Sequence, residues 1–230
     1  MKVYPKIPRY DHPVVSDAFY KADDLALLEK FDGSSFRFTL YDDRYAELYP
    51  DQVESAADGD GSVVFGTRKS IRGCHHDDFD DIDGALHRAV RCLRNGVDTT
   101  VLRRFHDEYD SPLIVYAENL VYSLDYGYTD RDLPALIGFD VLPYAEIGTM
   151  TPPGNPYEET FEGFLSTEEA WELFDQICIG GAPTTVSFVP ARILDSPAGG
   201  FDPDSYDFPS SSLASGVTVE GIVARSDKHA

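Results

Sequence analysis

The sequence predicts a single domain of the α+β class, and three observations support this prediction. Several segments have the apolar pattern of β-strands, and they alternate with segments that have the capping residues and apolar spacing of helices. The chain has 230 residues, 42% of them hydrophobic, so it can bury a substantial core. It contains no internal repeat and no stretch typical of a linker between domains.

The N-terminal part of the chain leads to a lysine at the end of a strand. Residues 1–15 contain three prolines and are expected to be extended. Ser16 is expected to cap a short helix that ends near Asp24. An apolar run over residues 25–28 follows, and Lys30 comes directly after it.

Lys30 is the first candidate for chemistry. A tight turn is predicted at Asp32-Gly33, so Lys30 lies where a strand meets a turn. A lysine in such a place has a fixed stem and a partly desolvated amine, and desolvation raises the fraction of neutral, nucleophilic amine. The alternative is an ordinary surface lysine in front of a hairpin turn.

A local basic cluster follows a short strand predicted at residues 62–66. It consists of Thr67-Arg68-Lys69-Ser70 and Arg72, in a chain that is otherwise rich in acid. Such a cluster suits a phosphate or a nucleic-acid backbone, and pairing with neighbouring aspartates is an equal alternative. We expect no metal at Cys74-His75-His76, because no second pair of ligands follows at zinc-like spacing.

Three further helices are predicted from their caps. One covers residues 83–95 and ends at Gly96, and the next begins at an Asp98 cap and continues to residue 109. The third opens with Ser166-Thr167-Glu168-Glu169, which has the spacing of a capping box.

The central strands differ in pattern. Residues 34–43 alternate, so one face of that strand is apolar. Residues 113–117 and 136–142 are almost continuously apolar, as in strands that are covered on both faces. The first of these delivers Glu118, and the second contains Asp140. A charge buried in an apolar strand needs a partner or a cation.

The C-terminal third predicts two strands and a long loop. A strand is expected at residues 185–189 and a polar loop at 195–215. The last strand covers residues 216–225 and places Thr218 and Glu220 on the same face.

Acidity is the strongest signal in the composition. The formal net charge is −22, and the chain has 28 Asp and 13 Glu but only 6 Lys. Such a surface keeps a protein soluble where concentrated salt screens charge within roughly 3 Å at 1 M. We therefore expect a cytoplasmic protein of a halophilic archaeon or of its virus, with an ordinary acidic protein as the alternative. Because salt screens repulsion, the net charge does not exclude nucleic acid as a partner.

The cysteines and the hydropathy exclude other classes. Cys74, Cys92 and Cys178 are widely spaced and odd in number, so buried free thiols in a reducing compartment are expected. No apolar run approaches the length of a bilayer span, and the N-terminus lacks the apolar segment of a signal peptide. We expect no membrane association.

Taken together, five short motifs give the chain a resemblance to a known family. They occur in this order: Lys30-Phe31-Asp32-Gly33, Phe65-Gly66-Thr67-Arg68, Tyr116-Ala117-Glu118-Asn119, Phe139-Asp140-Val141 and Glu220-Gly221-Ile222-Val223. The series resembles that of the covalent nucleotidyltransferases, which include RNA ligases, DNA ligases and capping enzymes. The segment from Tyr116 to Val141 is most similar to the ATP-dependent RNA ligases.

The resemblance implies a role for each matching residue. Lys30 would be the nucleophile that takes AMP from ATP. Glu29 and Phe31 would line the adenine pocket through their backbone, next to the turn residues Asp32 and Gly33.

Four further residues would complete the site. Arg68 would contact the ribose or the nucleic-acid end, with Arg72 as a substitute. Glu118 would hold the ribose, Phe139 would stack on adenine, and Glu220 would position a divalent metal, Mg²⁺ or Mn²⁺.

The resemblance also implies a fold and a partner. The fold would be the nucleotidyltransferase fold, two antiparallel sheets flanked by helices with a nucleotide cleft between them. The partner would be RNA ends or a nicked duplex, and we expect a monomer. The family also has a later Lys-x-Lys strand that contacts the α-phosphate. Only Lys228 follows Arg225 here, so we expect an incomplete catalytic domain in residues 1–230, with the missing segment supplied elsewhere.

Other functions stay open at this point. A DNA ligase or a GTP-using capping enzyme would carry the same motifs. A catalytically impaired homologue that only binds nucleotide or nucleic acid is a second alternative, and chance matches in a structural acidic protein are a third. No motif distinguishes RNA from DNA, because contacts to the 2′-OH have no sequence signature in this chain.

Overall fold

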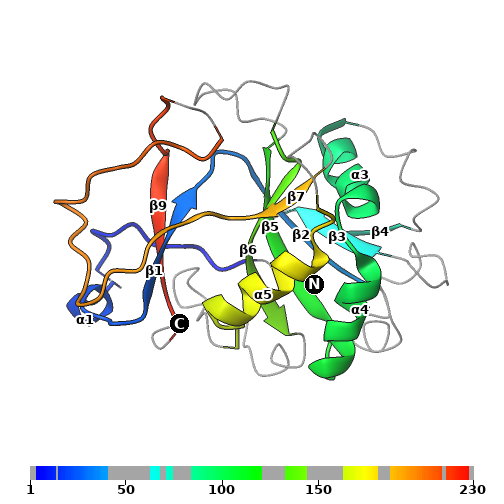
Figure 1. Cartoon of the computed structure of the whole chain (residues 1–230), viewed down its shortest axis with the longest axis horizontal. Coiled ribbons are helices and arrows are strands. Elements are labelled where there is room, and N and C mark those ends of the chain that lie inside the picture. The colour runs from blue at the N-terminus through cyan, green and yellow to red at the C-terminus, as the bar shows by residue number, and fades with distance from the viewer. Residues whose placement is uncertain are drawn as a thin grey trace.

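The computed structural model confirms the α+β class, with two β-sheets and flanking helices (Figure 1). The structure describes residues 4–13, 15–40, 63–67, 71–74, 84–120, 133–143, 163–180, 187–213 and 216–227. The predicted basic residues Arg68 and Lys69, together with His75 and His76, lie outside these ranges.

The larger sheet has six strands in the order β4-β3-β2-β5-β6-β7. Neighbouring strands are antiparallel except β6 and β7, which are parallel. The expectation of two purely antiparallel sheets is therefore wrong for this sheet. The chain passes from β6 through a helix before it enters β7, and such a crossover returns it in the same direction. The strands are β2 (Ser34–Leu40), β3 (Val63–Thr67), β4 (Ile71–Cys74), β5 (Leu113–Asn119), β6 (Leu136–Pro143) and β7 (Phe188–Pro190).

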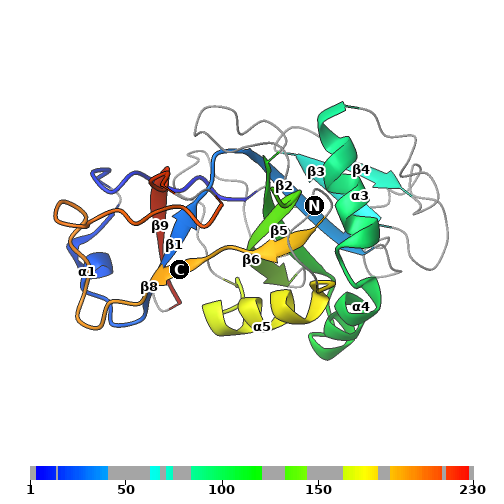
Figure 2. The same cartoon turned by 45° about the horizontal axis from the view of Figure 1, so that its top comes forward.

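The smaller sheet has three antiparallel strands in the order β8-β1-β9. They are β1 (Leu25–Lys30), β8 (Ile193–Asp195) and β9 (Gly221–Ser226). In the register of β1 and β9, Lys30 lies opposite Gly221 and Leu25 opposite Ser226. The end of β1 is therefore beside the beginning of β9, as Figure 2 shows.

Helices flank the large sheet (Figure 2). They are α3 (His87–Asn95), which follows the 3-10 turn η3 (Gly84–Leu86), α4 (Thr99–Glu108) and α5 (Thr167–Ile177), while the short α1 (Asp17–Tyr20) lies beside the small sheet.

The predicted caps are confirmed. The Asp98 side chain accepts hydrogen bonds from the amides of Thr100 and Val101, and Ser166 and Glu169 form the reciprocal capping box. Within the described residues, no helix is both long and apolar enough to cross a bilayer.

The main core lies between the large sheet and the helices. Phe36 and Phe38 of β2 point into it and contact the rings of Phe65 and Phe188, so the predicted apolar face of β2 is confirmed. The opposite face is also covered, because Arg37 is only 2% exposed. A second cluster built on Val64, Ile114, Tyr116 and Leu142, with Tyr4, Phe139 and Phe164 packed against it, lies apart from the main core.

Two strands were not anticipated, and one begins later than predicted. The sequence pattern predicts neither β4 nor β8, which are only four and three residues long. The last strand begins at Gly221 rather than 216, because residues 216–219 pair with residues 209–211 instead. The amide of Ser211 donates to the Val217 carbonyl at 2.7 Å, and the amide of Val219 donates to the Pro209 carbonyl at 3.1 Å. These two segments form a hairpin that leads directly into Glu220.

Candidate active site

The structure brings Lys30 and Glu220 together, although they are 190 residues apart in sequence. Lys30 is the last residue of β1, and Glu220 immediately precedes β9, so the register of the two strands makes them neighbours. The Lys30 ammonium donates a hydrogen bond to Oε1 of Glu220. A Cβ on Gly221 would lie 3.5 Å from Cδ of Lys30, so the lysine stem runs across the glycine that follows Glu220.

Lys30 is partly covered, and its amine is paired with a carboxylate. Its side chain is 46% exposed, whereas that of Glu220 is 16% exposed. Lys30 lies at the end of β1, beside the beginning of β9. An ion pair with a more deeply buried carboxylate holds the amine in place.

The second oxygen of Glu220 has an environment suited to a cation. Oε2 is buried and has no hydrogen-bond partner within the described residues. A buried carboxylate oxygen without a donor is costly, and a bound cation would remove that cost. Within the described part of the chain, no three His, Cys, Asp or Glu side chains are placed to hold a metal ion. An ion at Glu220 would therefore take most of its ligands from phosphate oxygens and water, as Mg²⁺ commonly does.

Gly33 and Glu118 lie against each other beyond the end of β1. A Cβ on Gly33 would be 2.6 Å from the carbonyl oxygen of Asn119 and 2.9 Å from Cγ of Glu118. Only glycine permits this approach, which brings the Glu118 side chain next to the turn that follows Lys30. The pairing of Ser35 with Glu118 between β2 and β5 sets this position.

Phe31 and Phe139 belong to the same apolar region. Phe31 is buried in a cluster with Leu120 and Ile137, and Phe139 packs against that cluster while half-buried. A register shift between β5 and β6 leaves Phe139 without a direct cross-strand partner. Such a bulge changes the direction of a side chain. The Tyr4 ring packs nearly perpendicular to the Phe139 ring, with centroids 4.9 Å apart.

Glu29 uses its side chain, although only a backbone role was expected for this residue. Its carboxylate is almost fully buried and accepts hydrogen bonds from Oγ of Ser211 at 2.5 Å and from the amide of Ser212 at 3.1 Å. Its own amide donates to the carbonyl of Arg192 at 2.9 Å. Glu29 therefore ties β1 to the hairpin that leads into Glu220. No sequence signal identifies a partner 182 positions away.

Asp140 has the partner that its apolar surroundings require. Its Oδ1 lies 3.1 Å from Nη1 of Arg225, and its Oδ2 accepts a hydrogen bond from the Tyr4 hydroxyl at 2.8 Å. Burial raises the pKa of Asp140 to about 6, against the opposing effect of the Arg225 charge and the donated hydrogen bonds. Burial beside Asp140 likewise raises the pKa of Tyr4. Arg225 is engaged here rather than facing the Lys30 end of the sheet.

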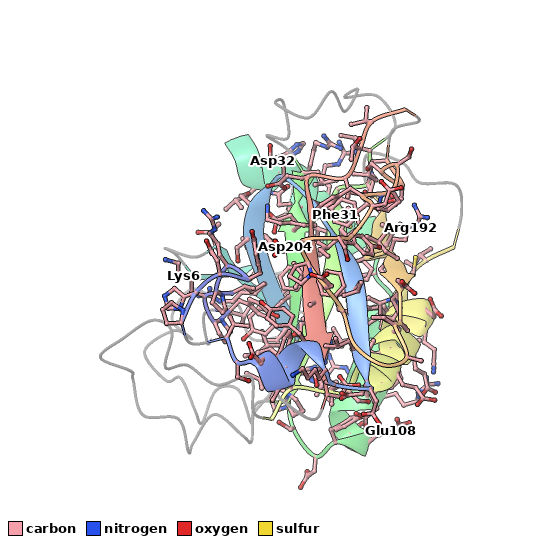
Figure 3. All side chains as sticks on the ribbon, turned by 90° about the vertical axis from the view of Figure 1, so that its left-hand side faces the viewer. Lys6, Phe31, Asp32, Glu108, Arg192 and Asp204 are labelled. Atoms are coloured by element: carbon pink, nitrogen blue, oxygen red, sulfur yellow. The ribbon has the colours of Figure 1, made fainter. Side chains whose placement is uncertain are left out.

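The remaining predicted residues are placed only in part. Figure 3 shows Phe31 and Asp32, which follow Lys30, at one end of the small sheet. Arg68 lies outside the described residues, and Arg72 is in β4. A hollow of about 370 Å³ lies between the beginning of β1, β8 and α5, and Asp24, Trp171 and Asp227 are among its lining residues. It is at the end of β1 opposite Lys30, so it is not the predicted nucleotide cleft.

Comparison of the sequence with models of known protein families and with curated proteins found no match. The arrangement of the site therefore has to be interpreted from its own chemistry. It consists of an amine paired with a carboxylate, an unsatisfied buried carboxylate oxygen, a second carboxylate at a glycine turn and a half-buried aromatic ring.

Proposed function

We propose that this protein is an ATP-dependent RNA ligase that first transfers AMP to Lys30. The observation that carries the proposal is the meeting of Lys30 with Glu220 at the junction of β1 and β9. Four of the five sequence motifs contribute residues to this region or to the adjoining cluster, with Glu118 at the Gly33 turn and Phe139 beside the Phe31 cluster. In the fifth motif, Phe65, Gly66 and Thr67 belong to β3, and Arg68 lies outside the described residues.

The first step would form a bond between Lys30 and the α-phosphate of ATP. The neutral amine attacks the α-phosphorus, a P–N bond forms, and the bond to the pyrophosphate oxygen breaks. Two protons leave the Lys30 nitrogen overall, one when the ammonium becomes the neutral amine and one as the P–N bond forms. Oε1 of Glu220 contacts the ammonium and would accept one of them, and water would take the other. Glu118 and Phe139 would hold the ribose and the base, and such positioning can supply several kcal/mol of the barrier reduction.

The later steps would join two RNA ends. The AMP group moves from Lys30 to the 5′-phosphate of one end, which restores the amine and activates that phosphate. The 3′-hydroxyl of the other end then attacks the activated phosphate, a phosphodiester bond forms, and AMP leaves.

Glu220 fits the role of a ligand for Mg²⁺ or Mn²⁺, because its Oε2 is buried and unsatisfied within the described residues. A divalent ion bound there would neutralise charge on the departing pyrophosphate. The other ligands would be phosphate oxygens and water.

Labelling with ATP tests the proposal. Incubation with α-labelled ATP and Mg²⁺ should give a covalent, acid-labile AMP adduct, and mass spectrometry should locate it on Lys30, one of six lysines. Lys30→Ala should abolish the label, while the matched control Lys21→Ala, which removes another exposed lysine, should retain it. Undiminished labelling of Lys30→Ala would refute the proposal.

The choice of nucleotide and substrate separates the alternatives. Label from GTP but not ATP would identify a capping-type enzyme instead of a ligase. Sealing of a nicked DNA duplex with no sealing of RNA would identify a DNA ligase. ATP binding without any adduct would identify a non-catalytic nucleotide-binding protein.

A further inference from the structure

Arg225 connects the two sheets. It lies in β9 of the small sheet, yet its side chain is only 11% exposed, and its guanidinium lies 3.1 Å from Asp140 in β6 of the large sheet. The same guanidinium donates to the carbonyl of Leu165, and its Nε lies 3.4 Å from Asp227. A buried guanidinium is costly without such partners, so these two ion pairs and the one hydrogen bond to Leu165 determine where it can sit.

Each of the two charged partners, Asp140 and Asp227, is itself held by another element. Asp140 accepts hydrogen bonds from the Tyr4 hydroxyl and from the amide of Val141 at 2.9 Å. Asp227 accepts hydrogen bonds from the amide and the hydroxyl of Thr167, the first residue of α5, at 2.9 and 3.0 Å. Arg225 thus meets partners that the N-terminal segment, β6 and α5 hold in place.

The network of Arg225 with Asp140 and Asp227 is joined to the candidate active site in two places, through Asp140 in β6 and through Arg225 in β9. Asp140 follows Phe139 in β6, and Tyr4 contacts both residues. Arg225 lies five residues after Glu220 on a strand that pairs along its whole length with β1. A paired strand is stiff over this distance, roughly 17 Å at 3.3 Å per residue. A shift of the Arg225 end along or away from β1 would therefore move the Glu220 end.

We propose that Arg225 is a positioning residue that sets where Glu220 stands relative to Lys30 and Phe139. The inference rests on the proposed function and adds a residue to it that touches neither the nucleotide nor the metal. Asp140 is the partner through which Arg225 acts, because it links β9 to the strand of Phe139.

The alternative is that Arg225 only stabilises the fold. Activity per folded molecule separates the two roles. Arg225→Met keeps the length of the side chain but removes its charge and donors, whereas Arg225→Lys keeps the charge without the planar fork. Arg104→Met is the matched control, because it removes an exposed arginine of α4 far from the site.

In the Arg225 variants we expect a lower rate of Lys30 labelling and not a smaller amount of folded protein. In Arg225→Met the rate of Lys30 labelling should fall roughly ten- to a hundredfold per folded molecule, since small misplacements of a reacting group have effects of this size. The KM for ATP should change little, and the Mn²⁺ concentration for half-maximal labelling should rise. Arg225→Lys should recover part of the rate, and Arg104→Met should equal the wild type. A rate for folded Arg225→Met within twofold of the wild type would overturn the proposal.

Two measurements test the proposal without an activity assay. Mn²⁺ affinity, measured by electron paramagnetic resonance, should fall in Arg225→Met because Glu220 is displaced. Amide hydrogen exchange over residues 220–226 should accelerate while exchange in β5 stays unchanged. If the wild type takes no label from ATP, the proposed function fails, and these two measurements still decide the role of Arg225. Unchanged affinity and exchange would reject it.

Asp140→Asn is the second variant, for the case that Arg225→Met does not fold. It keeps the shape of the side chain and one acceptor oxygen, so the fold should persist. It should lower the labelling rate and accelerate exchange over residues 220–226 in the same direction as Arg225→Met, by a smaller factor. Wild-type behaviour of Asp140→Asn in both measurements would contradict the coupling between β9 and β6.

Discussion

The two sheets are held together in different ways. In the large sheet, β3, β5 and β6 are buried almost throughout. The rings of Phe36, Phe38, Phe65 and Phe188 contact one another in a single core, and Phe188 also contacts Phe174 of α5. In the small sheet only β1 is buried, while β8 is largely exposed and every residue of β9 before Ser226 is half-buried. Polar contacts hold the small sheet in place, among them those of Glu29 with Ser211 and of Arg225 with Asp140.

The contacts of the two sheets have different consequences: those of the large sheet mainly stabilise the fold, and those of the small sheet mainly fix atomic positions. Apolar burial contributes most of the free energy of folding but is not directional, whereas hydrogen bonds and ion pairs contribute less and specify positions. The candidate reactive groups Lys30 and Glu220 belong to the small sheet, where directional contacts dominate. We therefore expect substitutions in the large sheet to change the free energy of unfolding and those in the small sheet to change the site.

Removal of salt should have the largest effect on the stability of the folded protein. A net charge of −22 creates strong repulsion at low ionic strength, where screening extends to about 10 Å at 0.1 M instead of roughly 3 Å at 1 M. Circular dichroism over a KCl series should show loss of structure on dilution, and hydrogen exchange should show the small sheet opening first. Exposed acids crowd around that sheet: Asp23, Asp195, Asp202, Asp204 and Asp207. A flat response down to millimolar salt would contradict salt adaptation.

Among single substitutions, Phe36→Ala should lower the free energy of unfolding the most. Phe36 is fully buried in the core of the large sheet, and its loss should lower the free energy of unfolding by about 3–5 kcal/mol. Phe208→Ala is the matched control, because Phe208 is 45% exposed in the loop that precedes the hairpin. Its effect should stay below about 1 kcal/mol. Equal losses in denaturant titrations of the two variants would remove the contrast between the regions.

Glu29→Ala should lower the free energy of unfolding less than Phe36→Ala does, but more than the exposed control substitutions. It leaves the Ser211 hydroxyl and the Ser212 amide without their acceptor, which should cost about 1–3 kcal/mol. Because these groups anchor the hairpin, hydrogen exchange over residues 209–219 should accelerate more than exchange in β5. Glu172→Ala, at an exposed position of α5, serves as the control. Slow exchange of the hairpin in Glu29→Ala would show that the carboxylate is not its anchor.

Asp140→Asn should have the smallest effect on the free energy of unfolding at neutral pH. Its main effect should be on how that free energy depends on pH. Burial raises the pKa of Asp140 in the folded protein to about 6, above its usual value near 3.9 in an unfolded chain. The folded state therefore binds this proton more tightly. The resulting stabilisation is fully present below about pH 4 and is lost as pH rises through about 6.

Asparagine does not titrate, so the variant should lack this slope. The difference in free energy of unfolding between wild type and Asp140→Asn should decrease from pH 4 to 6 and stay constant above that range. At pH 7 two effects oppose each other: the variant removes a carboxylate that burial disfavours, and it leaves the buried Arg225 guanidinium without its charged partner, so the net change in the free energy of unfolding should be small. Parallel pH profiles for the two proteins would contradict the raised pKa.

The sequence by itself determined the local elements of this protein. The Asp98 cap and the capping box of Ser166 and Glu169 were predictable, because each depends on groups within three residues of one another. The apolar face of β2 was predictable because strand side chains alternate with a period of two. The need of Asp140 for a partner also followed from its apolar neighbours, although the identity of that partner did not.

Only the tertiary structure decided which distant residues meet. The pairs Lys30 with Glu220, Glu29 with Ser211 and Asp140 with Arg225 are separated by 190, 182 and 85 positions. Their meeting depends on the register of β1 with β9 and on how the small sheet packs against the large one. Neither follows from local propensity, because hydrophobic periodicity indicates which face of a strand is buried but not which strand lies beside it.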